Sequence, residues 1–119
     1  MIPSRGDIFH TKFDPATGKE MKGDHYALVV TPKKFNAKLK MTVVCPISGG
    51  QASAARETGF LVSLMGAGTR VDGNIHVHQM KVVDVNEHIG EYVESIPDHI
   101  LLEVLMIFES LFDSQNLVK

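Results

Sequence analysis

The chain has 119 residues, of which 44% are apolar and 22% are charged, and its formal net charge is −2 at pH 7. These values are typical of one globular domain, here spanning residues 1–119, and no apolar run approaches the roughly 18 residues that a membrane-spanning helix needs. The near-neutral charge excludes a general electrostatic attraction to nucleic acid, so any such binding would need a local basic patch.

The cysteine content and the N-terminus limit the chemistry and the location of the chain. Cys45 is the single cysteine, so neither an intrachain disulfide nor a zinc site built from cysteines can form. The opening segment MIPSRGDIFH lacks the basic and then apolar order of a secretory signal peptide. We therefore expect a cytoplasmic protein.

The first half of the chain is predicted to form strands joined by connections. Residues 6–13, GDIFHTKF, alternate between two faces as a strand does. Residues 14–25 combine Asp-Pro with two glycines and several charges, which indicates an exposed loop. Apolar, β-rich runs predict buried strands over residues 26–32 and 41–47, with a basic connection, residues 33–40, between them.

The second half is predicted to contain two more strands and one helix. Residues 48–59 are small, polar and Gly-rich, which indicates a second long loop. A short strand is predicted over residues 60–64, and turns lead from it to the longest strand-like run, residues 74–85. The helix is predicted within residues 95–114, with Ser95 as its N-cap.

The predicted helix is apolar on most of its sides. Its apolar stripe has helical spacing, and three further side chains, Leu102, Met106 and Ile107, widen it. The stripe consists of Ile100, Leu101, Val104, Leu105, Phe108, Leu111 and Phe112. We expect this helix to pack on the sheet and also on a second copy of the chain, with residues 98–112 at or beside the interface. The elements together predict a small, mainly β domain of mostly antiparallel, strongly curved strands with a C-terminal helix.

Five segments, in their order along the chain, resemble the MazF/PemK family of mRNA interferase toxins from bacterial toxin–antitoxin systems. They are RGDIFHTKFDPATGKEMKG, ALVVTPKKFN, VVCPISGG, TGFLVSL and GNIHVHQMKVVDV. The pattern SGG followed by TGFLVSL is similar to the Kid/ChpB-like branch. The resemblance implies an SH3-like barrel of the CcdB/PemK type and a homodimer. It also implies sequence-specific cleavage of single-stranded RNA without metal or cofactor, and an antitoxin protein that covers the RNA site.

The resemblance also implies where the site lies. His25 stands where the family carries an Arg, Ser48 where it carries a Thr, and Lys19 where PemK-type toxins carry a His. His76 and His78 stand at the positions of an Arg-x-Asp pair. We therefore predict that the catalytic residues are His25, Ser48, His76 and His78. The residues predicted to bind RNA are Lys19, Glu20, Phe13, Thr58, Phe60 and Gln79.

The two histidines suit the chemistry that this resemblance implies. Attack by the 2′-OH of RNA needs a base, an acid for the leaving oxygen, and positive charge near the phosphate. Histidine can act as either base or acid, because its ordinary pKa is about 6.5. On one strand, Asn74, His76, His78 and Met80 would share a face, and alternate residues would be about 7 Å apart at the backbone. That spacing places an imidazole on either side of one phosphate.

Other interpretations of the same residues stay open. A His-x-His pair on a strand is often merely exposed, and it is also a ligand geometry for zinc, with a third ligand from His25, His10 or an acid. The lysines of residues 33–40 are candidates to guide the RNA backbone, or are simply solvated. The alternative function is protein binding, either by a catalytically altered or inactive family member that binds an antitoxin or by a CcdB-like inhibitor of gyrase, because fold does not determine function.

Overall fold

The computed structural model describes residues 1–49 and 59–115. Its strands are β1 (Asp7–Lys12), β2 (Asp24–Val29), β3 (Met41–Ser48), β4 (Leu61–Ser63), β5 (Asn74–His76), β6 (Lys81–Asp84) and β7 (Ile89–Ser95). Its helices are α1 (Lys33–Leu39), the 3-10 turn η1 (Val77–Gln79), α3 (Val85–His88) and α4 (Asp98–Leu111). The predicted mainly β fold with a C-terminal helix is confirmed.

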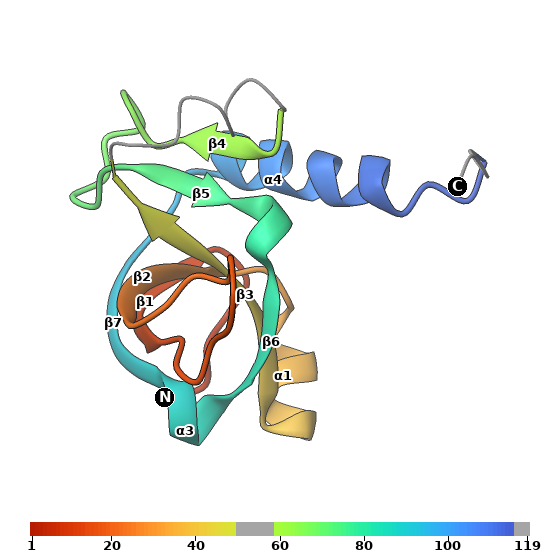
Figure 1. Cartoon of the computed structure of the whole chain (residues 1–119). Coiled ribbons are helices and arrows are strands. Elements are labelled where there is room, and N and C mark those ends of the chain that lie inside the picture. Colours follow the sequence, from red (N-terminus) through yellow and green to blue (C-terminus); the bar gives the residue numbers. More distant parts are fainter. Residues whose placement is uncertain (50–58, 116–119) are drawn as a thin grey trace.

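The strands form one antiparallel, seven-stranded sheet in the order β4-β5-β3-β2-β1-β7, with β6 paired to β3 next to β5. The sheet is strongly curved, and β7, α3 and β6 complete a ring around the core (Figure 1). Within the described residues no ladder joins β6 to β7, so hydrogen bonds do not close the predicted barrel. No helix in this part of the chain is long and apolar enough to cross a membrane.

The curved sheet buries apolar side chains in two groups. The group between the sheet and α4 includes Ile8, Leu28, Ile75 and Val104, together with Cys45. Burial raises the pKa of the Cys45 thiol to about 12, so this cysteine is a small, protonated core residue. The second group lies inside the ring and consists of Phe9, Phe13, Ala27, Val29, Val44 and Val83.

The basic connection predicted over residues 33–40 is in fact the helix α1. Pro32 precedes its first turn, and Lys40 ends it with a φ of 56°. Asn36 is the buried residue of this helix, and its side-chain amide donates to the carbonyls of Pro3 and Thr31, both at 2.9 Å. The sequence of α1 has no amphipathic pattern, because the side chain that faces the protein, Asn36, is polar and most of its neighbours are exposed.

The strand predicted over residues 74–85 is also wrong in its middle, where η1 separates β5 from β6. Ile47 pairs with Ile75 and Val44 pairs with Lys81, so two residues of β3 lie opposite the five residues 76–80. One of those two is Pro46, which has no backbone N–H to donate to a ladder. The surplus residues therefore leave the sheet as a 3-10 turn.

The helix α4 begins at Asp98, after Pro97, and Ser95 is not its cap. Ser95 instead ends β7, where its hydroxyl donates to Asp7 at 2.8 Å and hydrogen-bonds the hydroxyl of Tyr92 at 3.0 Å. This network ties the start of β1 to the end of β7. Between β6 and Ser95, where the sequence analysis predicts no element, the structure has α3, whose N-cap is the Asp84 carboxylate, and the strand β7.

Candidate active site

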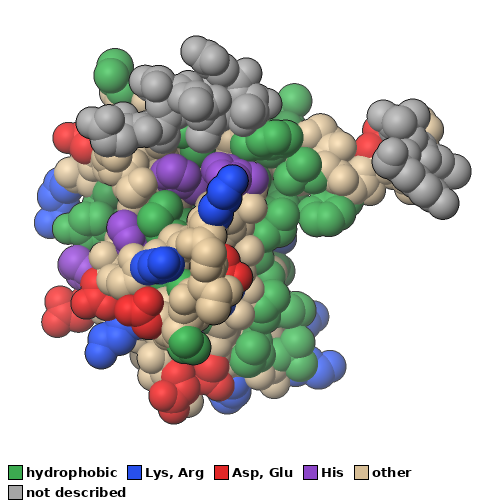
Figure 2. Space-filling model, viewed as in Figure 1, with side chains coloured by type: hydrophobic (Ala, Val, Ile, Leu, Met, Phe, Trp, Pro, Cys, Tyr) green, Lys and Arg blue, Asp and Glu red, His purple; other side chains and the backbone are tan. Residues whose placement is uncertain are grey.

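Four of the predicted site residues come from separate elements and meet at one end of β3. Ser48 ends β3, His76 ends β5, His78 lies in η1 and His25 lies in β2. Histidine side chains are visible together on this face, beside lysine or arginine side chains, with acidic side chains gathered farther down (Figure 2). The sequence order of the motifs therefore identified groups that the fold brings together.

The closest contact in this cluster joins Ser48 to His76, whose Oγ and Nε2 atoms are 2.8 Å apart. Ser48 pairs with Asn74 across the β3–β5 ladder, which makes His76 its diagonal neighbour. Gly73 allows this approach: its φ is 116°, and a Cβ there would lie 2.7 Å from the Ser48 carbonyl oxygen. A side chain at position 73 would push the serine away from the imidazole.

His76 is the buried member of the histidine cluster, with 7% of its surface exposed. Its pKa is lowered from the ordinary value of 6.5, first by burial and then by the charges of His78 and His25. An imidazole with a lowered pKa is neutral at neutral pH, so one ring nitrogen keeps a free lone pair. His76 is therefore suited to accept a proton.

His78 is exposed and lies beside His76, with 5.7 Å between the ring centroids. Its ring is also 6.2 Å from that of Phe60. The common strand face predicted for Asn74, His76, His78 and Met80 is wrong, because η1 turns His78 to the solvent while His76 stays buried. The two imidazoles are nevertheless adjacent, in two different environments.

His25 is half-buried, and its Nε2 atom donates to the carbonyl oxygen of Lys22 at 2.8 Å. A carbonyl oxygen can only accept, so this bond sets which nitrogen carries the proton and leaves Nδ1 for other contacts. The ring of Phe13 packs 6.2 Å away. His25 can thus add charge when protonated, but its orientation depends on the loop that contains Lys22.

Some of the residues predicted to bind RNA are exposed at a pocket beside His78, and another is packed in the core. A pocket of about 230 Å³ is lined by Phe13, Glu20, Met21, His78, Gln79, Met80 and Lys81. Lys19 and Glu20 are exposed, and Phe60 is half-buried beside His78. Phe13 is only 1% exposed and packs in the core, so its predicted contact with RNA stays a prediction. Thr58 lies outside the described residues.

Two polar groups near this pocket hold the loop between β1 and β2. The Gln79 side chain hydrogen-bonds the backbone of Lys19 and Met21, and the Lys81 ammonium donates to the carbonyls of Phe13 and Pro15. Sequence reasoning missed Lys81, because its partners are more than sixty residues away in the chain. Nothing in the local sequence signals such a contact.

The other sequence interpretations can be compared with this geometry. Within residues 1–49 and 59–115, no group of three His, Cys, Asp or Glu side chains is placed to hold a metal ion, so the zinc interpretation lacks a described third ligand. The lysines of α1 lie at the start of β3, whereas Ser48 ends it, a separation of about 23 Å along the strand. They could contact only RNA that extends well beyond the histidines.

Comparison with known proteins agrees with the fold and the motifs. Residues 4–112 match the PemK-like, MazF-like toxins of type II toxin–antitoxin systems, and the chain belongs to this family. It is 38% identical over 101 residues to Endoribonuclease PemK of Escherichia coli, covering 85% of this chain and 75% of that protein. It is 34% identical over 110 residues to Endoribonuclease toxin ChpB of Escherichia coli (strain K12), covering 92% and 93%.

Solved structures give the same fold. MazF of Deinococcus radiodurans (Form-I) superposes with a TM-score of 0.81 at 25% identity, covering 93% of this chain and 96% of that one. The MazE–MazF structure (Form-II) from the same organism gives a TM-score of 0.76 at 24% identity, covering 96% and 98%. The family resemblance predicted from the five sequence segments is confirmed.

Proposed function

We propose that this toxin is an endoribonuclease that cleaves single-stranded mRNA at a short sequence, by attack of the 2′-OH and without a metal ion. Two endoribonucleases, PemK and ChpB, are its relatives along most of the chain. The observation that carries the proposal is the Ser48–His76 contact of 2.8 Å at a buried imidazole of lowered pKa, next to the exposed His78. These groups supply a base, an acid and a hydrogen-bond donor within reach of one phosphate.

In the proposed mechanism His76 is the general base. Its free ring nitrogen takes the proton of the 2′-OH, and the 2′-oxygen then attacks the adjacent phosphorus. The Ser48 hydroxyl orients the imidazole or donates to a phosphate oxygen, since either role lies within hydrogen-bond reach of His76. Burial supports this assignment, because it keeps the His76 imidazole neutral, and only a neutral imidazole can accept the substrate's proton.

His78 is the general acid of the mechanism. As an imidazolium it donates a proton to the 5′-oxygen while the bond from phosphorus to that oxygen breaks. The products are a 2′,3′-cyclic phosphate and a 5′-hydroxyl, so no water or cofactor is consumed in this step. The charges of Lys19 and, when protonated, His25 stabilise the negative phosphorane.

The function is tested by incubating the purified protein with a mixed single-stranded RNA in EDTA. We expect cleavage at a recurring short sequence, at the same rate with and without EDTA, and products with the two ends described above. Cleavage that EDTA abolishes and zinc restores would instead support the zinc interpretation. A folded protein that binds an antitoxin but cleaves no RNA would support the protein-binding alternative.

We also propose that an antitoxin segment of acidic or amphipathic character covers the loops at residues 14–25 and 48–59; of the second loop, only residues 48, 49 and 59 are described. The solved MazE–MazF structure from Deinococcus radiodurans motivates a partner of this kind. Lys19 and Lys22 are exposed in the first loop, beside His25, so they can contact acidic side chains of such a partner, while the loop also carries the exposed acids Asp14, Glu20 and Asp24. The proposed mRNA substrate would place this action in the cytoplasm.

An antitoxin that binds there should protect the amides of residues 14–25 from hydrogen exchange. The measurement compares the free toxin with the toxin bound to its antitoxin. Protection confined to α4, with none in the 14–25 loop, would contradict the proposed binding surface.

A further inference from the structure

The Gln79 side chain pairs with the loop between β1 and β2 as a neighbouring strand would. Its Oε1 atom accepts from the Met21 amide at 3.2 Å, and its Nε2 atom donates to the Lys19 carbonyl at 2.9 Å. A primary amide offers both a donor and an acceptor, so the side chain satisfies two backbone groups at once. Gln79 directly follows His78, so the loop is bonded to the segment that carries the exposed imidazole.

Lys81 makes a second connection, two residues farther on. Its ammonium donates to the carbonyl oxygens of Phe13 at 3.2 Å and Pro15 at 3.1 Å, at the start of the same loop. Hydrogen bonds to an ionised donor are stronger than those between neutral groups. Gln79 therefore holds the middle of the loop, and Lys81 holds its beginning.

The loop's own hydrogen bonds shape it but do not place it against η1. The amide of Phe13 donates to the carbonyl of Gly23, which closes the base of the loop. Near its tip, the Thr17 amide donates to the Glu20 carboxylate at 2.8 Å. Without the contacts from Gln79 and Lys81, this exposed hairpin would be free to move as a unit away from the pocket.

We propose that Gln79 and Lys81 are positioning residues that latch the loop of residues 13–23 over the histidine cluster, so that Lys19 and Glu20 face RNA bound at His78. The consequence for RNA rests on the proposed ribonuclease function, whereas the latch itself does not. The latch gives Gln79 a role through the loop, in place of the direct RNA contact predicted from the sequence. It also steadies His25, whose ring is bonded to the carbonyl of Lys22.

The test replaces Gln79 with Ala and measures both the loop and the reaction. Trypsin cuts after lysine, and Lys19 and Lys22 are exposed in the loop, so nicking there reports how often the loop opens. Loss of both amide bonds should raise the rate of nicking by roughly thirtyfold, the combined factor expected from two hydrogen bonds of ordinary net strength. The KM for RNA should rise by a similar factor, while kcat and the pH profile stay close to those of the wild type.

Further variants separate the latch from a general loss of stability. Gln79→Glu keeps the size and the acceptor but presents a carboxylate to the Lys19 carbonyl, so it should open the loop as Gln79→Ala does. Lys81→Met should also raise nicking, and Lys81→Arg, which keeps charged donors, should restore protection. Gln115→Ala, at an exposed glutamine near the C-terminus, is the matched control and should change neither readout.

The outcomes distinguish this proposal from the proposed function. A higher KM with unchanged tryptic nicking in Gln79→Ala would mean that Gln79 touches the RNA directly, and would overturn the latch. Unchanged nicking in both Gln79→Ala and Lys81→Met would also overturn it. If the wild type cleaves no RNA but both variants are nicked faster, the latch stands and the ribonuclease proposal fails.

Discussion

Replacing His76 with Ala is expected to lower RNA cleavage by about 10²–10⁴-fold, the usual range for removal of a general base. The same loss is expected for His78→Ala, because each imidazole serves one of the two proton transfers. The measurement is kcat/KM on a defined single-stranded RNA, in EDTA. His10→Ala is the matched control, since His10 is exposed on β1 and packs on Tyr26, with 4.6 Å between the rings.

The pH dependence of the wild type should identify which histidine is the base. His76 must be neutral to act, and its pKa is lowered from 6.5, so cleavage should decline only as the pH falls below 6.5. At higher pH the acid loses its proton and the rate should fall again, which gives a bell-shaped profile. His76→Ala should remove the acidic limb, and His78→Ala the basic limb.

Two results would contradict these assignments. Full activity in the double variant His76→Ala with His78→Ala would mean that neither imidazole takes part in the reaction. A profile whose acidic limb disappears in His78→Ala, but not in His76→Ala, would exchange the roles of base and acid. Burial would then not be the factor that decides which imidazole accepts the proton.

Alternation along β1 and the apolar runs of β2 and β3 predicted much of the sheet, because both patterns depend only on neighbouring residues. β1 and β4 lie within the runs predicted for them, β3 ends one residue after its run, and β2 begins two residues before its run. The break at η1 is different, because it results from three surplus residues opposite Pro46 in another strand. Such a register mismatch involves two strands at once, so neither segment shows it alone.

The candidate site, like the sheet, was predicted only in part: the grouping of its residues was predicted, but their burial was not. The motif order placed Ser48, His76 and His78 in one site, and the fold brings them together. The sequence could not show that His76 is buried while His78 is exposed, since both belong to one alternating run. It also could not show that Phe13 belongs to the core, because both faces of the predicted strand carry apolar side chains, Ile8 on one and Phe9 and Phe13 on the other.

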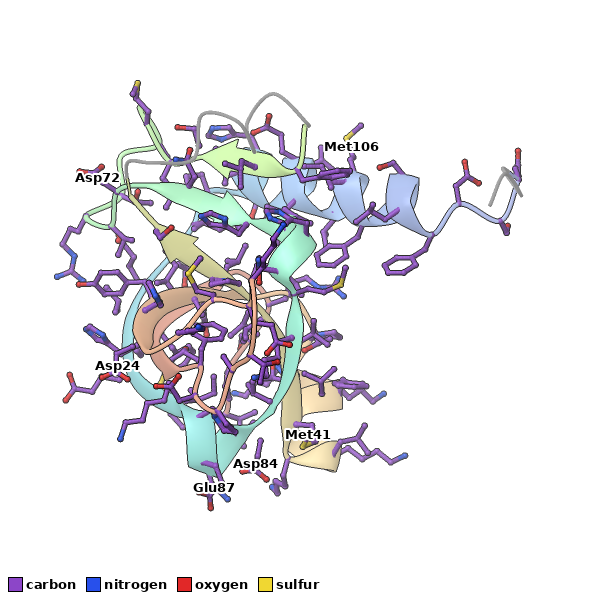
Figure 3. The ribbon with its side chains drawn as sticks, viewed as in Figure 1. Asp24, Met41, Asp72, Asp84, Glu87 and Met106 are labelled. Carbon is purple, nitrogen blue, oxygen red and sulfur yellow. The ribbon has the colours of Figure 1, made fainter. Side chains whose placement is uncertain are left out.

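We propose that the chain forms a homodimer through α4, and the structure indicates which side chains take part. Leu102 and Met106 lie one turn apart on α4 and are 59% and 57% exposed, and Phe112 after its end is 70% exposed. The helix extends past the sheet, and Met106 projects from it (Figure 3). An apolar groove of about 290 Å³, lined by Val30, Thr31, Val43, Met80, Leu105 and Phe108, continues this surface towards the sheet.

An apolar surface of this kind is stabilised by removal from water, at about 25 cal/mol for each Å² buried. A second copy that covers both the helix and the groove could reach the roughly 1,200 Å² of a specific interface, whereas one exposed methionine could not. The helix also packs on η1 and β4, so the same interface would support the segment that carries His78.

The wild type is therefore expected to sediment as a dimer at micromolar concentration, and Met106→Glu as a monomer. The variant should keep its thermal stability, because the Met106 side chain is mostly exposed and its replacement leaves no cavity in the core. Met65→Glu is the matched control: Met65 is 86% exposed, in the turn after β4, and this change should leave the dimer intact. A wild type that sediments as a monomer, or a Met106→Glu protein that stays dimeric, would mean that the apolar face of α4 is covered by another partner or by none.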